Sequence, residues 1–251
     1  MAIRQCVRIK DAKCIATGVY EMLLLTPQMA EQAKAGQFIS IYSNDGSRLL
    51  PRPISICEVC GDCLRVVYRV AGKGTEEFSK MKAGEYLDVQ GPLGNGYTIS
   101  EKKALILGGG IGIPPMLQLA KSINAEKEIV LGYRDELFLN DDFGRYGHVT
   151  IATEDGSCGT KGNVLDAIKE RGLKGEVIYA CGPMPMLRAV KRYAEDNNME
   201  AYISLEEKMA CGIGACLACV CKTTKKDEHS QVNNTRICKE GPVFDAREVD
   251  I

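Results

Sequence analysis

Residues 104–115 read Ala-Leu-Ile-Leu-Gly-Gly-Gly-Ile-Gly-Ile-Pro-Pro, and this stretch decides the fold class of the second half of the chain. Four apolar residues predict a short buried strand, and the two prolines suit the first turn of a helix. Glycines between a strand and a helix let the backbone approach a phosphate, which the helix N-terminus attracts. The Gly-x-Gly-x-x-Gly spacing is missing, so a plain strand–turn–helix corner stays open for Gly108, Gly109, Gly110, Ile111 and Gly112.

Strand and helix patterns alternate from this stretch onward. Apolar residues at helical spacing begin near Met116, Val164 and Met186. Such alternation indicates a parallel sheet with helices on both faces, so we expect an α/β nucleotide-binding domain over residues 100–204. The expected strands are Ala104–Leu107, Ile129–Leu131, Val149–Ala152, Val177–Ala180 and Tyr202–Ser204.

A second turn of small residues follows the strand expected at Val177–Ala180. It reads Cys181-Gly182-Pro183-Met184 and lies at the carboxyl end of that strand, where open α/β sheets bind ligands. Both turns are therefore candidates for holding a dinucleotide. Cys181 is either a buried spacer or a contact of a nicotinamide ring, and its chemistry alone does not choose between them.

The first 99 residues predict a different architecture. Six short strands with turns between them indicate a small antiparallel barrel over residues 1–99, with one short helix at Gly74–Met81. At the fourth strand, Arg52-Pro53-Ile54-Ser55 offers a guanidinium and a hydroxyl to a pyrophosphate, although a solvated surface arginine is the plain alternative. The expected strands are Cys6–Ala16, Val19–Thr26, Phe38–Tyr42, Ile54–Val59, Leu64–Val70 and Tyr86–Gln90.

The most specific signal is a cluster of cysteines near the C-terminus, within a module expected over residues 205–251. Cys211, Cys216 and Cys219 have the C-x4-C-x2-C spacing of plant-type [2Fe–2S] sites, and we expect Cys238 as the fourth ligand. Small residues between them allow a loop to wrap tightly around a cluster. Disulfides or a zinc site are the alternatives. Cys221 is expected to be an apolar spare, and the polar stretch Lys222–Arg236 a solvated hairpin or loop.

A second group, Cys57, Cys60 and Cys63, straddles a predicted turn in the barrel. It has no obvious fourth ligand nearby, so we expect small buried residues in the barrel wall rather than a metal site.

Bulk composition limits the possible functions. The 251 residues carry a formal net charge of −1, which gives no electrostatic case for nucleic acid or an anionic membrane as a partner. We find neither the roughly eighteen consecutive apolar residues that span a bilayer nor a signal peptide, so we expect a cytoplasmic protein without a membrane partner. The chain has twelve cysteines, and metal ligation is their better explanation in a long, unsecreted chain.

Together these motifs resemble the ferredoxin–NADP reductase superfamily over nearly the whole chain. Arg52–Ser55 matches its flavin motif, although Ile54 replaces the usual aromatic residue, and Gly91–Gly94 matches the end of its flavin domain. The resemblance implies a barrel that binds FAD through Arg52, Pro53, Ile54, Ser55, Tyr68, Arg69, Val70, Gly74 and Thr75. It also implies NAD at the two turns of small residues. Tyr68 is a candidate to replace the missing aromatic ring.

The C-terminal segment narrows the resemblance to electron-transfer subunits of type B (NAD-dependent) dihydroorotate dehydrogenases. Leu205–Met209, the cysteine loop and Cys238–Phe244 carry this likeness. It implies an oxidoreductase subunit in pyrimidine synthesis, with an FMN-containing catalytic partner in a two-plus-two heterotetramer. Electrons would pass from the partner's FMN through the [2Fe–2S] cluster and FAD to NAD+. Asp135 and Glu136 disfavour a 2′-phosphate whereas Arg134 favours one, and charge and resemblance together favour NAD.

Three alternatives remain. The nearest is an electron-input flavin/iron–sulfur subunit of another NAD(P)H-linked reductase complex. A redox-sensing regulator would need a DNA- or protein-binding element, and we find no basic helix and no spare domain. A disulfide-rich binding module would require secretion.

Overall fold

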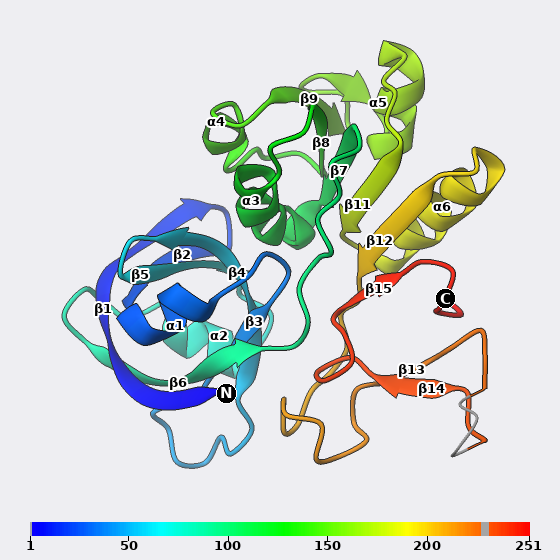
Figure 1. The fold of residues 1–251 in the computed structure, drawn as a ribbon. Coiled ribbons are helices and arrows are strands. Elements are labelled where there is room, and N and C mark those ends of the chain that lie inside the picture. The colour runs from blue at the N-terminus through cyan, green and yellow to red at the C-terminus, as the bar shows by residue number, and fades with distance from the viewer. Residues whose placement is uncertain (1, 227–230) are drawn as a thin grey trace.

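Six strands form a closed antiparallel barrel in the N-terminal part of the computed structural model (Figure 1). The structure describes residues 2–226 and 231–251. Around the barrel the strands follow the order β1-β2-β5-β4-β3-β6, and all six predicted strands are confirmed. Their bounds are β1 (Ile3–Ala16), β2 (Val19–Leu25), β3 (Phe38–Ile41), β4 (Arg52–Cys60), β5 (Cys63–Arg69) and β6 (Tyr86–Leu93).

Side chains along β3 point alternately into the barrel and away from it. Ile39 and Ile41 point into the barrel core, because successive side chains of a strand face opposite sides. Phe38 packs on the outer side with residues of the C-terminal segment. Two short helices accompany the barrel, α1 (Pro27–Gln32) and α2 (Lys73–Phe78). The second confirms the helix expected near Gly74.

A seven-stranded sheet forms the second part of the molecule, in the order β10-β9-β8-β7-β11-β12-β15. The strands pair in parallel except β15, which pairs antiparallel with β12, and the five predicted strands are confirmed. The strands are β7 (Ala104–Gly109), β8 (Lys127–Tyr133), β9 (His148–Thr153), β10 (Thr160–Lys161), β11 (Val177–Cys181), β12 (Glu200–Ser204) and β15 (Val243–Asp245). The helical segments are η1 (Gly110–Gly112), α3 (Ile113–Ser122), α4 (Asn140–Phe143), α5 (Val164–Arg171) and α6 (Met184–Asp196).

Helices cover both faces of this sheet, as the alternating pattern predicts. Ile106 of β7 packs with Met116 of α3 on one face. Leu107 of the same strand packs on the other face with Ile168 of α5 and Val190 of α6. These strands are apolar on both sides because both sides are buried.

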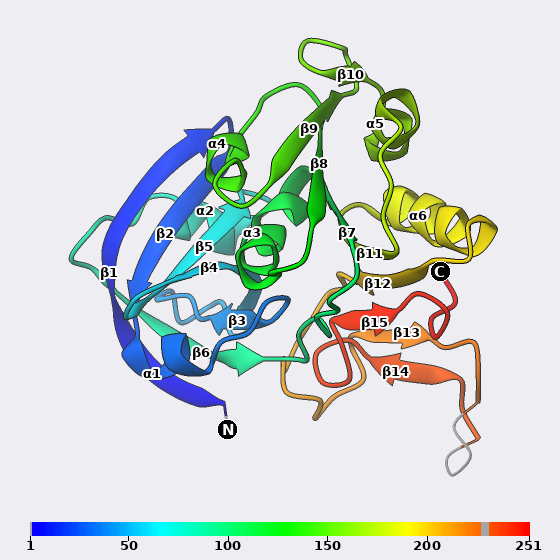
Figure 2. The ribbon, with the colours of Figure 1, turned by 45° about the horizontal axis from the view of Figure 1, so that its top comes forward.

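The C-terminal segment carries the cysteine loop, a small hairpin and the returning strand β15 (Figure 2). In the hairpin, β13 (Val220–Lys222) pairs antiparallel with β14 (Asn234–Arg236). This agrees with the hairpin expected over Lys222–Arg236, although residues 227–230 of that stretch lie outside the described residues. The sequence pattern did not indicate β15. The expected fold class is confirmed, whereas the divisions at 99/100 and 204/205 stay predictions.

The barrel and the sheet meet along α3. The Gln118 side chain accepts a hydrogen bond from the Val59 amide at 2.8 Å, and Lys121 Nζ lies 3.0 Å from a carboxylate oxygen of Glu58. No helix within residues 2–226 and 231–251 is long and apolar enough to cross a membrane.

Candidate functional site

The two predicted nucleotide turns lie side by side at the carboxyl ends of β7 and β11. The strands are neighbours in the sheet, and Gly108 pairs with Cys181. A methyl group at Gly112 would lie 2.5 Å from the carbonyl oxygen of Cys181 and from the amide of Gly182. Only glycine permits this approach, so the structure brings the two motifs into direct contact.

The remaining glycines of the first turn differ in their surroundings. A methyl group at Gly109 would lie 2.5 Å from the Met186 sulfur, whereas Gly110 has a φ of +53° and nothing within 4 Å. The turn is therefore packed on the side of α6 and open at Gly110. Open backbone beside two helix starts fits a dinucleotide pyrophosphate, so the residues present suit NAD.

Cys181 lies at the end of β11, close to the polar side chains of Ser204 and Tyr97. Burial raises the pKa of its thiol to about 12, and a hydrogen bond with Ser204 partly opposes the shift. The thiol is therefore protonated at neutral pH, and whether it contacts a nicotinamide stays open. Beside it, the Tyr97 hydroxyl donates to the carbonyl of Ala180 at 3.1 Å. Sequence reasoning missed Tyr97, and its only signal was its place just after the Gly91–Gly94 motif.

The flavin-motif residues begin β4 at a gap in the barrel wall. Arg52–Ser55 pair with β3 on one side, as in Ser40 with Pro53. On the other side the ladder with β5 begins only at Ile56 and Val66. Among the described residues, Arg52–Ser55 thus have no ladder partner on β5. This free edge faces the end of β5, where Arg69 is exposed.

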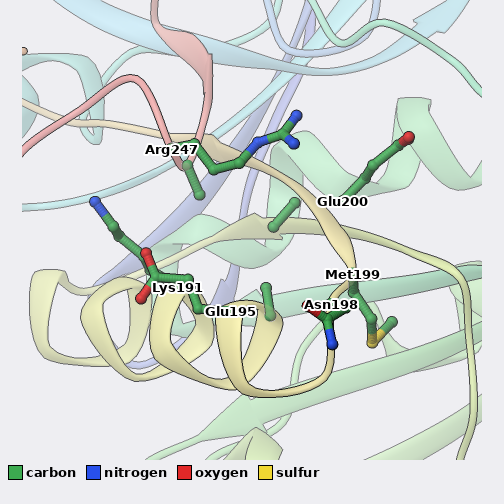
Figure 3. Close-up of a pocket in the computed structure, with 9 residues that line it drawn as sticks. Lys191, Glu195, Asn198, Met199, Glu200 and Arg247 are labelled. Carbon is green, nitrogen blue, oxygen red and sulfur yellow. The ribbon is translucent and has the colours of Figure 1, made fainter. Parts of the chain in front are cut away.

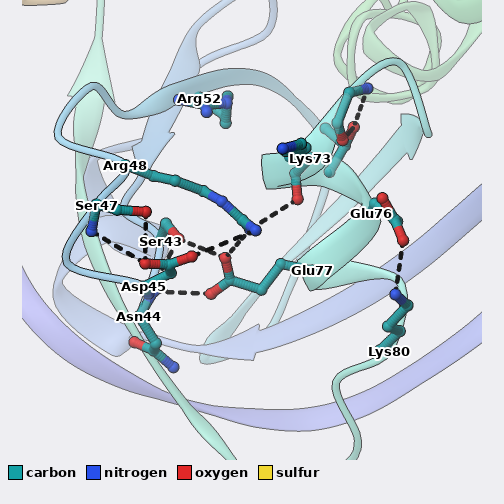
Figure 4. Close-up of polar contacts among 12 residues, drawn as sticks. Ser43, Asn44, Asp45, Ser47, Arg48, Arg52, Lys73, Glu76, Glu77 and Lys80 are labelled. Atoms are coloured by element: carbon teal, nitrogen blue, oxygen red, sulfur yellow. Dashed lines mark hydrogen bonds and ion pairs between the residues drawn. The ribbon is translucent and has the colours of Figure 1, made fainter.

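Arg52 lies against the turn that begins α2 (Figure 4). A methyl group at Gly74 would lie 2.5 Å from the Arg52 Nε, so the guanidinium rests on the glycine backbone. Thr75 shapes the same turn, because its hydroxyl oxygen accepts hydrogen bonds from the amides of Ala71 at 2.9 Å and Gly72 at 3.2 Å. A guanidinium offers charge-assisted hydrogen bonds to phosphate oxygens, so Arg52 suits the pyrophosphate of FAD.

Glu77 fastens the loop before β4, and the sequence did not reveal this role. Its carboxylate accepts hydrogen bonds from Ser43, from the Asn44 amide at 2.8 Å and from Arg48 at 2.7 Å (Figure 4). A cavity of about 280 Å³ lies beside Glu77, lined also by Asp45, Arg48, Lys73, Glu76 and Lys80. Glu77 therefore fixes the loop that leads into the flavin-motif strand.

The Tyr68 ring is buried within the barrel, and its part in replacing an aromatic residue at position 54 stays a prediction. It is 2% exposed and lies in the barrel core, with ring centroids 6.2 Å from Tyr20 and 6.3 Å from Phe78. Burial raises the pKa of its hydroxyl well above the ordinary range. The direction of a side chain on β5 depends on the strand register, which decides whether it points into the barrel.

Four cysteines of the C-terminal segment gather in two pairs. The sulfurs of Cys211 and Cys216 are 3.3 Å apart, and the Cys238 amide lies 3.4 Å from the Cys219 sulfur. A backbone amide from Gly214 points at the Cys238 sulfur at 3.1 Å. Two pairs of thiols suit a centre of two irons that each take two thiolates. All twelve cysteines are free, so no disulfide competes for these sulfurs.

Backbone amides in the cysteine loop favour thiolate. Although burial opposes ionisation, hydrogen bonds from the amides of Ile213, Cys216 and Ala215 lower the pKa of Cys211 to about 6. Burial raises the pKa of Cys238 to about 12, so this thiol needs a bound metal to lose its proton. The donor set fits an iron–sulfur cluster, with these amides available to its sulfurs.

The cysteine loop touches the barrel next to the flavin-motif strand. A methyl group at Gly212 would lie 2.9 Å from the Ser40 hydroxyl oxygen, and Ser40 pairs directly with Pro53. Phe38, Cys219 and other residues share one apolar cluster across this contact. The cluster loop therefore contacts the strand that pairs directly with the flavin motif.

Four other cysteines lie in the barrel wall or in the hairpin, outside the two pairs. Cys57 and Cys63 are buried in the barrel wall, and Cys60 pairs with Cys63 across the β4–β5 turn, as expected for small wall residues. Cys221 lies on β13 opposite Thr235, and burial raises its pKa to about 11. None of these four is hydrogen-bonded to the paired cluster cysteines in the described residues.

The acidic residues after β8 have mixed environments. Arg134 and Asp135 form an exposed ion pair at 3.3 Å, whereas Glu136 accepts a hydrogen bond from the Thr17 amide of the barrel at 2.9 Å. The preference for NAD over NADP stays a prediction.

A cavity of about 450 Å³ lies against α6 and β12, and no predicted site residue lines it (Figure 3).

Comparison with known proteins identifies relatives of this chain. Residues 206–250 match the family model of the iron-sulfur cluster binding domain of dihydroorotate dehydrogenase B. A ferredoxin NADP+ reductase from Neisseria gonorrhoeae with bound FAD and NADP has a TM-score of 0.65 at 16% identity, covering 77% of this chain and 91% of that one. A chain of an NADH-dependent reduced ferredoxin-NADP oxidoreductase has a TM-score of 0.87 at 28% identity, covering 97% and 89%.

Two relatives carry the same name over their full length. The dihydroorotate dehydrogenase B (NAD(+)) electron transfer subunit of Fusobacterium nucleatum is 42% identical over 268 residues, which is 100% of both chains. That of Caldanaerobacter subterraneus is 42% identical over 244 residues, which is 96% of both. The chain therefore belongs to the family of dihydroorotate dehydrogenase B (NAD(+)) electron transfer subunits.

Proposed function

We propose that this chain carries electrons from the FMN of a dihydroorotate-oxidising partner subunit to NAD+, in pyrimidine biosynthesis. The observation that carries the proposal is the position of Gly212 over Ser40, which pairs with Pro53. It puts the cluster loop against β3, the strand that pairs with the flavin motif on β4. A nicotinamide moves two electrons as hydride, a [2Fe–2S] cluster moves one, and a flavin handles both, so FAD belongs between them.

The residues proposed to hold FAD lie on two sides of the gap between β4 and β5. Arg52 would bind the pyrophosphate from its place on Gly74, with Thr75 holding the turn in shape. Pro53, Ile54 and Ser55 would contact the flavin through the free edge of β4. Arg69 and Val70 would close the site from β5, together with Tyr68.

The residues proposed to hold NAD are those of the two converging turns. Gly110 offers open backbone to the pyrophosphate, and the contact of Gly112 with Cys181 sets the distance between the turns. The set comprises Gly108, Gly109, Gly110, Ile111, Gly112, Cys181, Gly182, Pro183 and Met184.

Cys211, Cys216, Cys219 and Cys238 are proposed as the cluster ligands, since they alone form the two close pairs among the described cysteines. Ile213 and Leu217 project from this loop, with 49% and 72% of their surface exposed. Exposed apolar side chains beside the cluster suit the docking of a partner subunit. A two-plus-two assembly and a cytoplasmic location, where twelve free cysteines can remain reduced, complete the proposal.

A second candidate is the electron-input subunit of another NAD(P)H-linked reductase complex. The 28% identical oxidoreductase chain, with its TM-score of 0.87, favours this candidate. The relatives at 42% identity favour the dihydroorotate enzyme more strongly.

Copurification with the natural partner tests the proposal. We expect bound FAD, two irons with acid-labile sulfide per chain, an FMN-containing partner, and dihydroorotate-dependent reduction of NAD+. A copurifying FMN subunit without dihydroorotate activity would favour the second candidate. Anaerobic material without iron and sulfide would contradict both.

A further inference from the structure

Residues Gly94–Tyr97 form a junction that touches all three parts of the chain. Gly94 accepts a hydrogen bond from Gln37 at 2.8 Å, and the Tyr97 amide donates to Ala35 at 2.9 Å, both in the barrel. The Tyr97 hydroxyl reaches Ala180 of the sheet at 3.1 Å. Asn95, which follows Gly94, faces the C-terminal segment.

Asn95 makes three hydrogen bonds to the turn that follows Cys238. Its amide nitrogen donates to Gly241 at 2.6 Å. Its side-chain nitrogen donates to the carbonyls of Glu240 at 2.9 Å and Lys239 at 3.2 Å. Both side-chain donors are therefore used, and both acceptors lie within two residues of a cluster cysteine.

The backbone contact around Asn95 is too close for a larger neighbour. Gly94 has a φ of +72°, and a methyl group there would lie 2.6 Å from Pro242 Cδ and 2.8 Å from the carbonyl oxygen of Gly241. Asn95 also forms an isolated bridge with Pro242. The junction thus meets the turn backbone to backbone.

The same turn holds the opposite side of the cluster loop. Arg236 forms an ion pair with Glu240 and donates to the carbonyl oxygen of Gly214 at 2.7 Å. A continuous series of contacts therefore runs from Asn95 through the Arg236–Glu240 turn to the loop that contains Cys211 and Cys216.

We propose that Asn95 is a positioning residue for electron transfer, fixing the cluster-bearing turn against the flavin barrel. This inference rests on the proposed function. The primary amide is suited to the role because it presents two donors to two carbonyls and carries no charge. An aspartate would lose both donors and turn a carboxylate toward the same carbonyls.

The test uses the full chain loaded with FAD and cluster, as wild type, Asn95→Ala and Asn95→Asp. NADH is added anaerobically, and bleaching of the flavin and of the cluster is followed separately by stopped-flow absorbance. Flavin reduction should stay within about twofold of wild type. Asn95→Ala loses two side-chain hydrogen bonds. Cluster reduction should slow about fivefold or more in this variant, because the loss of even one hydrogen bond changes a docking equilibrium by about that factor. Asn95→Asp should be slower still.

Asn197→Ala is the matched control, since the Asn197 side chain also donates to a backbone carbonyl, that of Tyr193 at 2.7 Å, but on the exposed end of α6. Its two rates should equal those of wild type. A second readout is independent of turnover. Amide hydrogen exchange over residues 236–242 should rise in Asn95→Ala and stay unchanged in Asn197→Ala.

Wild-type rates of cluster reduction in both Asn95 variants would overturn the inference. So would equal slowing of flavin and cluster, or loss of cluster absorbance, since these indicate a general structural role. A wild-type chain that binds flavin and cluster but transfers no electrons between them would overturn the proposed function together with this inference.

Discussion

Arg65 of the barrel and Asp142 of α4 form an ion pair of 3.0 Å across the interface between the barrel and the sheet. The same guanidinium binds Glu21 and lies 3.4 Å from Glu58, which in turn pairs with Lys121 of α3. The Arg65 side chain is only 14% exposed. One buried cation thus compensates three carboxylates that come from both sides of the interface.

Replacing Arg65 by methionine should lower the free energy of unfolding by about 3 kcal/mol, because it removes the least exposed of the cations that these partly buried carboxylates pair with. Urea unfolding of the purified chain measures this change. The control is Lys80→Met, which removes an exposed pair with Glu76 and should change stability by less than about 0.5 kcal/mol. Equal effects of the two variants would contradict the assigned importance of the interface.

The Glu58 carboxylate should make this interface sensitive to acid. Burial raises its pKa, but hydrogen bonds from Lys121 and Arg65 outweigh burial and hold the pKa below its ordinary value of 4.5. The folded pKa is therefore the lower one. Its stabilising contribution is complete above 4.5 and is lost as the pH falls through the folded pKa. The stability difference between wild type and Glu58→Gln should be constant at neutral pH and shrink below pH 4.5. A difference that grows on acidification would refute this sign.

Cys216→Ser should abolish iron binding, whereas Cys221→Ser should not. Cys216 lies 3.3 Å from the Cys211 sulfur, while Cys221 lies on β13 outside the two pairs. Iron and sulfide analysis with visible spectra gives the comparison. The Cys216 variant should retain FAD and NADH-dependent reduction of a dye, because the proposed flavin and nicotinamide residues are elsewhere. Loss of iron in both variants would reopen the ligand assignment.

Arg52→Ala should weaken FAD binding by about tenfold to a hundredfold, as expected for one or two charge-assisted hydrogen bonds to a pyrophosphate. Fluorescence titration of the flavin-free chain measures the affinity. Arg145→Ala removes a guanidinium that is 72% exposed, outside the proposed site, and is the control. Unchanged FAD affinity in Arg52→Ala would show that Arg52 is a solvated surface arginine and does not bind the pyrophosphate.

Local patterns were enough to predict the strands and the glycine turns. The turn at Gly108–Gly112 has a glycine wherever the structure requires close approach or positive φ, so its signal is contained in adjacent residues. The C-x4-C-x2-C spacing of the cysteines is likewise typical of one kind of site, a plant-type [2Fe–2S] centre. These features depend on neighbours in sequence, which is why a single sequence carries enough signal to predict them.

Contacts between residues far apart in the chain could not be predicted from local sequence patterns. Arg65 is hydrogen-bonded to Asp142, which is 77 residues away in sequence, and Asn95 to Glu240, which is 145 residues away. Strand β15 has three residues, too few for a period of two to be recognised. The direction of the Tyr68 ring depended on register within the barrel, and register is set by all strands together.

Ser40→Ala should stabilise the chain when it is prepared without iron and sulfide. Ser40 is 1% exposed, and its hydroxyl has no hydrogen-bond partner among the described residues. A buried hydroxyl without a partner costs about 1 to 3 kcal/mol, so its removal should raise the free energy of unfolding by about 1 kcal/mol after the loss of packing. Ser79→Ala is the control, since Ser79 donates to Glu76 at 2.8 Å on the surface and its loss should be neutral or slightly destabilising. Urea unfolding at neutral pH compares the two. A destabilised Ser40→Ala chain would show that the hydroxyl already has a partner between the flavin motif and the cysteine loop, and the contact at Gly212 would then be polar rather than simply close.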